Sequence, residues 1–339
     1  MANVTQSQRR PRPMNVYTRR GSPAEDKYRA FSGVPGLVPT DIAPGIPPVP
    51  AHDLLYHGGK TIPNLTFTNF YVGADAWQSS DVQAIDKALT EAMTEPTLNN
   101  VMVQYFTAQP TSTFVASQRL PGPAPARLSK GDVEQLVIGL HTQGKLSSFD
   151  LSTTVFNFML PSGTVLSDNP TAGGAQSIAE PTARRGIPEE DEVDSLHGLG
   201  GYHGSVEIDG LTVYYAVGVY SETNGGQTNG IPVFDQPWKN VVATFYHELN
   251  EARTDPDVEK VIQGASASLL GWTSRQGEEC GDFPVAEANP LTLVFQEVPV
   301  ADGGTTPVQF QYSNYVHGPE GPVATPDPAS KHRARHNNP

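Results

Sequence analysis

The sequence predicts an α+β domain in which helices back a twisted, mixed sheet, and three observations support this fold class. Strand-like and helix-like patterns alternate over residues 66–163, as expected for a sheet covered by helices on at least one face. A clear hairpin signal and a long amphipathic helix, residues 234–257, follow this alternation. Both ends of the chain lack hydrophobic periodicity, so we expect a single domain over residues 51–322.

The composition limits the classes of function. The chain has 339 residues, with 32 Gly, 31 Pro and 37% hydrophobic residues, so irregular segments should surround the compact centre. Its net charge of −14 argues against nucleic acid as a partner, because phosphate binding requires a basic surface, and it is compatible with cation binding. Cys280 is the only cysteine, which excludes an internal disulfide and a cysteine-based zinc site.

The sequence contains no recognisable targeting or membrane segment. No apolar run reaches the length of a membrane span, and the N-terminal residues lack the hydrophobic stretch of a secretory signal. We therefore expect a soluble, cytoplasmic protein with no membrane partner, or one exported by a route that needs no signal.

Residues 1–50 are expected to form a Pro-rich arm that contains several arginines. Repeated prolines favour an extended or disordered chain over a helix or an inner strand. The arm is either disordered or wraps loosely on the acidic body or on a neighbouring subunit, which would make the protein a homo-oligomer or an assembly component. Residues 323–339 are expected to form a disordered tail.

The first part of the domain should alternate strands and helices. Residues 66–73 and 153–163 have the β-branched and aromatic pattern of strands, and the apolar run 101–106 predicts a further strand. Two helices are expected between them, because residues 79–96 and 128–146 carry apolar side chains at helical spacing, and the second helix should be capped near Ser129.

Residues 166–200 interrupt this alternation. They lack hydrophobic periodicity, and their acidic cluster at 189–192 lacks the spacing of a calcium loop, so a solvated insertion or a lid is expected. The pair Asp209-Gly210 then separates two strand-like runs and predicts a hairpin. Two later strands should be joined by a tight turn at 302–304.

The chain is organised around the helix predicted at residues 234–257. Asp235 is a candidate cap, Pro237 suits the first turn, and Pro256 should end the helix. One face should be buried because its apolar residues recur at helical spacing: Trp238, Val241, Val242, Phe245, Leu249 and Ala252.

A second face of this helix carries the chemistry. His247 and Glu251 are four residues apart, so an imidazole and a carboxylate lie one turn apart and could hold a divalent ion. Glu248 lies beside them and could accept a proton from a water molecule that the ion activates. The alternative is an ordinary solvated face, since charged helix surfaces are common.

Four short motifs follow one another along the chain: YHGGK at 56–60, GYHGSV at 201–206, HELNEARTDP at 247–256 and GEECGD at 277–282. Together they resemble motifs of the Exordium-type (phosphate-induced) proteins and their bacterial relatives. The third motif is the most specific. The chain departs from the plant members in lacking a signal peptide, and the resemblance implies a fold more than an activity.

The order of elements is also similar to that of zincin peptidases, in which a twisted sheet with backing helices precedes a helix with metal ligands one turn apart. This resemblance implies a zincin-like fold, with His247 and Glu251 as ligands and Glu248 as general base. It also implies a third ligand from the later GEECGD segment. Asp282 is preferred for that position, and Glu279 is either the ligand itself or a partner that hydrogen-bonds one.

Other histidines have two interpretations each. The zincin resemblance implies that His317 could stabilise an oxyanion, although its sequence context also fits a surface loop. His203 and His57 follow or precede glycines, so each could line a cleft or could hydrogen-bond the backbone of a turn.

The expected cofactor is a divalent metal. One histidine with two carboxylates suits zinc best, and the additional carboxylate makes calcium or manganese possible as well. The leading function is a metal-dependent, peptidase-like hydrolase acting on a peptide or protein. The alternative is a non-catalytic, metal-stabilised binding or structural protein.

Overall fold

The computed structural model describes residues 16–17, 43, 45–106, 108–170 and 193–322, and for residues 16–17 it describes the backbone alone. The predicted arm over residues 1–50 and the predicted tail over 323–339 lie almost entirely outside these residues. So does the middle of the predicted insertion, residues 171–192.

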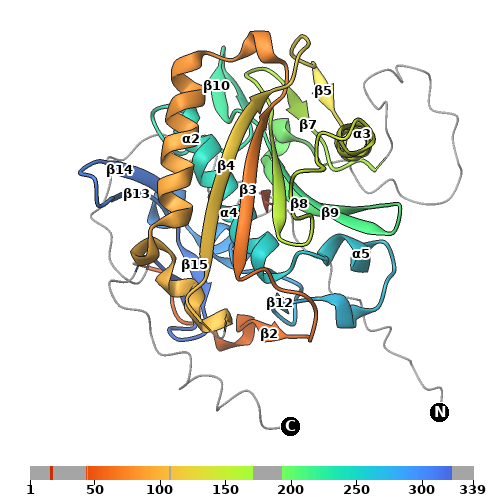
Figure 1. The fold of residues 1–339 in the computed structure, drawn as a ribbon. Coiled ribbons are helices and arrows are strands. Elements are labelled where there is room, and N and C mark those ends of the chain that lie inside the picture. The colour runs from red at the N-terminus through yellow and green to blue at the C-terminus, as the bar shows by residue number, and fades with distance from the viewer. Residues whose placement is uncertain (1–15, 18–42, 44, 107, 171–192, 323–339) are drawn as a thin grey trace, which may run out of the picture.

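A mixed sheet crosses the molecule, with strand order β1-β8-β9-β6-β3-β4 (Figure 1). Strands β4, β3, β6 and β9 are parallel, β8 runs antiparallel to β9, and the two-residue β1 pairs antiparallel with β8. The mixed α and β composition agrees with the predicted class. The strands are β1 (Val16–Tyr17), β3 (Asn64–Tyr71), β4 (Thr111–Arg119), β6 (Thr154–Met159), β8 (Leu199–Ile208) and β9 (Leu211–Gly218).

Helices cover both faces of this sheet. Helices α2 (Ser79–Thr94) and α4 (Pro237–Thr254) pack on one face, and α3 (Lys130–Thr142) packs on the other. Alternate side chains of a strand point to opposite faces, and β6 follows this rule. Val155 packs with the residues of α2 and α4, whereas Phe156 packs with those of α3.

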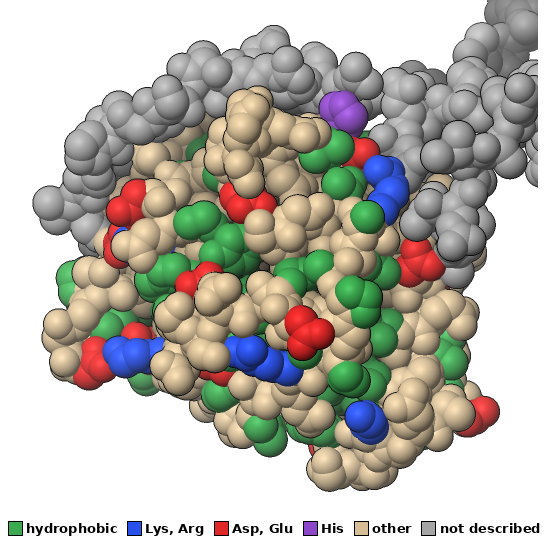
Figure 2. Space-filling view, turned by 90° about the horizontal axis from the view of Figure 1, so that it is seen from above, with side chains coloured by type: hydrophobic (Ala, Val, Ile, Leu, Met, Phe, Trp, Pro, Cys, Tyr) green, Lys and Arg blue, Asp and Glu red, His purple; other side chains and the backbone are tan. Residues whose placement is uncertain are grey.

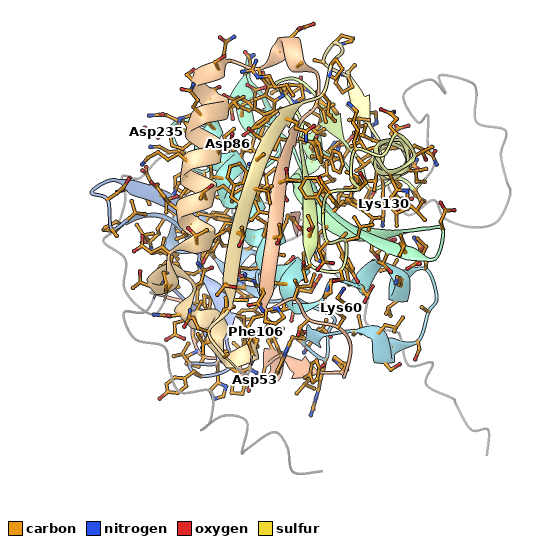
Figure 3. All side chains as sticks on the ribbon, in the orientation of Figure 1. Asp53, Lys60, Asp86, Phe106, Lys130 and Asp235 are labelled. Atoms are coloured by element: carbon orange, nitrogen blue, oxygen red, sulfur yellow. The ribbon has the colours of Figure 1, made fainter. Side chains whose placement is uncertain are left out.

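Helix α4 is central, with every side chain from Asn240 to Thr254 buried. The interpretation of its polar face as solvated is therefore wrong. The helix ends before Pro256, as predicted, but the predicted cap is also wrong: Gln236 is the N-cap residue, and its side chain does not cap the backbone of the first turn. Asp235 lies one residue earlier, and its carboxylate accepts a hydrogen bond from Lys239 instead (Figure 3).

Two further local predictions are confirmed. Ser129 and Asp132 form a reciprocal capping box at the start of α3, satisfying backbone donors that the first turn leaves free. The β8–β9 hairpin turns at Asp209 and Gly210, which both have positive φ, 52° and 79°. Such a turn matches the right-handed twist of the two strands.

The run 101–106 was expected to be a strand, and this prediction is wrong. Residues Pro96–Tyr105 form the 3-10 helix η3, and Asn99 donates to the Ala92 carbonyl at the end of α2. A short apolar run is compatible with a buried strand or a buried helix, so periodicity cannot separate them. The strand that pairs with β3 on the side away from β6 is β4, for which no strand was predicted.

The predicted insertion over 166–200 is also too long, because η4 (Ser195–His197) and the start of β8 lie within it. The expected strands around residues 302–304 are present as β13 (Phe295–Pro299) and β14 (Thr305–Gln309). No helix in the described ranges combines the length and apolar character needed to cross a bilayer.

The remaining elements are short. The paired strands are β2 (Leu55–Tyr56) with β12 (Trp272–Thr273), β5 (Arg127–Leu128) with β7 (Val165–Leu166), β10 (Glu222–Asn224) with β11 (Gln227–Asn229), and β15 (Gln311–Ser313) with β16 (Gly318–Glu320). The short helices are η1 (Pro50–His52), η2 (Ala74–Ala76), α5 (Val258–Ile262), η5 (Ala267–Leu269), α6 (Asp282–Glu287) and η6 (Leu291–Leu293).

Candidate metal centre

Seven titratable side chains gather around α4, and we call them the α4 cluster. None is more than 5% exposed. Such a concentration of carboxylates and imidazoles in the interior is costly unless the charges are paired or coordinate a metal. The cluster consists of His203, His247, Glu248, Glu251, Asp255, Glu279 and Asp282.

Helix α4 positions four of these residues. His247 and Glu251 follow one another along one face, and His247 Nε2 lies 2.9 Å from Glu251 Oε2. Asp255 is the C-cap residue one turn later, where its Oδ1 accepts a hydrogen bond from the Gly271 amide. Glu248 is 1% exposed and points its carboxylate to His203 rather than to solvent.

The segment 274–282 brings the next two carboxylates to the helix. Ser274 organises this turn, since its hydroxyl accepts from the Glu278 amide and donates to the Glu278 carboxylate. The turn is attached to α4 through the Gly281 amide, which donates to Glu251 Oε1 at 3.0 Å. The Glu279 amide in turn donates to Asp282 Oδ2 at 2.8 Å.

The contacts of His247 define its tautomer. Its Nδ1 lies 2.5 Å from Gln309 Oε1, and the amide group of Gln309 is oriented because its Nε2 donates to the Gly281 carbonyl. The amide oxygen can only accept, so Nδ1 of His247 carries the proton. The lone pair of Nε2 is then free and points at a carboxylate oxygen, which is the orientation of a histidine that binds a metal.

His203 reaches the cluster from strand β8. Its neighbour Tyr202 packs in the α3 core, so the alternation of the strand directs His203 to the α4 side of the sheet. Its Nδ1 lies 3.2 Å from Glu248 Oε2, and its Nε2 lies 3.3 Å from the Asp255 carbonyl oxygen and 3.5 Å from Glu279 Oε1.

Two sets of three residues place potential ligand atoms within 4.8 Å of one another. The first contains His247, Glu248 and Glu251, and the second contains His203, Glu251 and Glu279. Asp282 belongs to neither set, and one of its oxygens accepts a hydrogen bond from the Glu279 amide. The geometry therefore favours Glu279 over Asp282 as the additional carboxylate, contrary to the preference drawn from the sequence.

Burial controls the electrostatics of the cluster. It raises the pKa of Glu251 well above the usual range, and the charge of Glu248 adds to the effect. The pKa values of Glu279 and Asp282 are raised in the same way, by burial first and by the charge of Glu251 second. Burial raises the pKa of Asp255 to about 7. Each of these carboxylates therefore requires either a proton or a cation.

The pKa of His203 is raised as well. Burial alone would lower it, but the hydrogen bond to Glu248 and the charges of Glu248 and Glu251 outweigh that effect. None of the carboxylates in the cluster forms an ion pair with Lys or Arg in the described part of the chain. Arg253, on the same helix, donates instead to Ser112 and to the Thr111 carbonyl.

Lysines near the sheet are also paired elsewhere. Lys130 bonds Glu259, and Lys60 donates to the Ser152 carbonyl (Figure 3). On the face drawn in Figure 2 the Asp and Glu side chains lie apart from one another and are interspersed with Lys and Arg. The cluster is therefore a concentration of acid in the interior that no Lys or Arg of the described residues balances.

Four buried atoms of the cluster have no hydrogen-bond partner among the described residues: His247 Nε2, Glu248 Oε1, Asp255 Oδ2 and Glu279 Oε1. Buried polar atoms are normally paired, so this group of unpaired atoms offers ligand atoms to a bound ion. All four are oxygen or nitrogen acceptors with lone pairs, which is the donor set of a divalent cation.

The other candidate residues lie elsewhere. His317 is paired with Asp53 at 2.9 Å and its side chain is 41% exposed, so its contacts do not place it in the cluster and do not support the predicted oxyanion role. The side chains of His57 and Thr273 share a hydrogen bond. Cys280 is buried and accepts a weak hydrogen bond from Thr254, in agreement with a packing role.

Comparison of the chain with protein-family models, with curated proteins and with solved structures finds no match.

Proposed function

We propose that this protein binds a divalent cation between His247 and Glu251 and is a metal-dependent hydrolase in which Glu248 is the general base. The observation that carries the cation is the unpartnered Nε2 of His247, which faces Glu251 Oε2 at 2.9 Å. With Nδ1 bound to Gln309, two lone pairs face each other at this distance. They repel one another unless a proton or a cation lies between or beside them.

The position of Glu248 supports the hydrolase. It follows His247 directly in the helix, its Oε1 is unpartnered, and its Oε2 is held by His203. When bound, the cation would polarise a water molecule and lower the pKa of that water. Glu248 is placed to take the proton at Oε1, while the contact with His203 fixes the orientation of the carboxylate.

The order of elements supports a zincin-like plan. A sheet with helices on both faces precedes α4, which carries the two ligands one turn apart, and segment 274–282 supplies a further carboxylate. We propose a peptide or protein substrate on this likeness. The four motifs that resemble Exordium-type proteins also lie near the α4 cluster. Three of them contain His203, Glu251 and Glu279. The fourth contains His57, whose amide donates to the carbonyl of Gly271.

The donor atoms bear on the identity of the cation. Imidazole nitrogen with carboxylate oxygen suits zinc, whereas the high proportion of carboxylates is also compatible with manganese or calcium. We propose zinc as the physiological ion.

A second function is favoured by burial. Every residue of the cluster is at least 95% buried, as expected for an ion that stabilises a fold rather than one that a substrate reaches. In this case the protein is a metal-stabilised binding or structural protein and Glu248 has no catalytic role.

Glu248→Gln separates the two functions. If Glu248 is the general base, the zinc-loaded variant should retain its metal and lose at least about 100-fold of the activity of the wild type on a peptide library. Metal content and turnover are measured on the same samples. The exposed Glu287→Gln on α6 is the matched control and should keep full activity. Metal without turnover in wild type and variant alike would support the structural ion and contradict the hydrolase.

Gly281→Ala tests the support of the site. A Cβ at this position would lie 2.3 Å from His247 Nδ1 and 3.0 Å from Glu251 Oε1, so the methyl group should displace the imidazole and break its bond to Gln309. We expect cation affinity to fall by about 10- to 100-fold, as for the loss of other groups that orient ligands. Titration calorimetry on the cation-free protein measures it. Gly139→Ala on α3, where a Cβ has space, should bind like the wild type.

A further inference from the structure

The two ligand sets share one carboxylate. The set of His247 and Glu248 and the set of His203 and Glu279 share Glu251 and no other residue. His203 turns Nδ1 towards Glu248 and Glu251, and it turns the opposite nitrogen, Nε2, towards Glu279 and Asp255. The imidazole of His203 thus separates Glu279 from Glu248.

The unpartnered atoms are divided in the same way. His247 Nε2 and Glu248 Oε1 belong to the first set, and Glu279 Oε1 belongs to the second. Asp255 Oδ2 is also unpartnered, and its residue contacts His203 through the backbone oxygen. One cation between His247 and Glu251 would satisfy His247 Nε2 directly and Glu248 Oε1 through its water molecule, and it would leave the second pair of atoms unexplained.

The charges are compatible with a second ion. The cluster holds five carboxylates, with a total charge of −5 when ionised, against two histidines and no described Lys or Arg partner. One divalent cation with neutral histidines leaves −3 on these buried side chains, and two leave −1. Uncompensated buried charge is strongly destabilising, so the remaining carboxylates must be neutralised by protons or by a second ion.

We propose that the α4 cluster holds two divalent cations bridged by Glu251, the second bound by His203 and Glu279 with Asp255 beside it. This inference rests on the proposed cation at His247 and extends it. In proteins that hold two metals, the ions lie about 3.5–4 Å apart and share ligands, as a single bridging carboxylate requires.

The stoichiometry of manganese binding tests the proposal. The full-length protein is freed of metal by dialysis against a chelator, loaded with Mn²⁺ and desalted, and bound metal is measured by elemental analysis. We expect two ions per chain and an electron paramagnetic resonance spectrum with the spin coupling of a manganese pair. One ion per chain with an uncoupled spectrum would overturn the second site and leave the proposed function standing. No bound ion would overturn both.

Variants assign each ion to its ligands. His203→Ala should bind one manganese per chain and lose the coupled spectrum, and Glu279→Gln tests the same site with His203 in place. His317→Ala is the matched control, because His317 is paired with Asp53 outside the cluster, and it should bind two. Two coupled ions in a folded His203→Ala or Glu279→Gln variant, verified by circular dichroism, would contradict the assignment.

Discussion

Removal of the cations should lower the melting temperature of the protein by about 10 °C. A ligand present at about 1,000 times its dissociation constant stabilises the folded state by about 4 kcal/mol, and about 1 kcal/mol shifts the melting temperature of a domain of this size by about 2–4 °C. The stabilisation is specific to the folded state, because the ligands come from β8, α4 and segment 274–282 and meet only when the chain folds. Differential scanning calorimetry with and without chelator measures the shift.

Glu251→Gln should lower the melting temperature of the cation-loaded protein and raise that of the cation-free protein. Glu251 belongs to both ligand sets, so loss of its charge weakens cation binding and lowers the melting temperature of the loaded protein. In the cation-free protein the same substitution removes a buried carboxylate that faces Glu248, and the variant should melt above the wild type. The exposed Glu287→Gln should change neither value by more than about 1 °C. A variant less stable than the wild type in both states would contradict this account of the cluster.

The cation-free protein should lose stability as the pH rises from about 4 to about 7. Burial raises the pKa of Asp255 to about 7, and the pKa values of Glu251, Glu279 and Asp282 are also above the usual range. Over this interval the folded state keeps protons that the unfolded chain has released, so the free energy of unfolding falls as the pH increases. The pKa of His203 is also raised, so this histidine lowers the free energy of unfolding further as the pH rises above about 6.5.

The size of the effect is substantial. The shift of the pKa of Asp255 alone corresponds to about 4 kcal/mol between pH 4 and pH 7. Urea unfolding of metal-stripped protein at several pH values measures the loss, and zinc-loaded protein should show less of it because the ions replace the protons. Asp255→Asn should flatten the profile of the metal-stripped protein. An increase in stability over the same interval would show that these carboxylates are ionised and compensated in the absence of metal.

Local patterns in the sequence were sufficient to predict the central helix and the closeness of His247 and Glu251 on it. The spacing of His247 and Glu251 places both on one face of any helix, whatever surrounds it. The Asp209-Gly210 turn and the Ser129 cap were predictable for the same reason, since each depends on the conformational preference of a few neighbouring residues.

Properties that depend on distant segments were not predictable. Whether the polar face of α4 is solvated is decided by β8 and by segment 274–282, and the sequence of the helix contains no information about either. The run 101–106 is apolar except for Gln104, so the packing of η3 decides its conformation. One oxygen of Asp282 accepts from the Glu279 amide, and this contact depends on the exact path of the turn, which the sequence does not reveal.

His203 shows where the sequence held an unused signal. The hairpin signal lies at Asp209-Gly210, whereas β8 already begins at Leu199. Extending the alternation of the strand back to residue 202 places His203 on the face opposite Tyr202 and therefore on the side of α4. The histidine would then have been a candidate ligand on the basis of strand periodicity alone.

The most direct test of a cation at α4 is the anomalous scattering of a crystal of the zinc-loaded protein, recorded on both sides of the zinc absorption edge. We predict an anomalous peak about 2 Å from His247 Nε2 and from the nearer oxygen of Glu251, the usual lengths of zinc bonds to nitrogen and oxygen. A zinc-loaded crystal with no anomalous peak within the α4 cluster, and with His247 and Glu251 joined by a direct hydrogen bond, would contradict it.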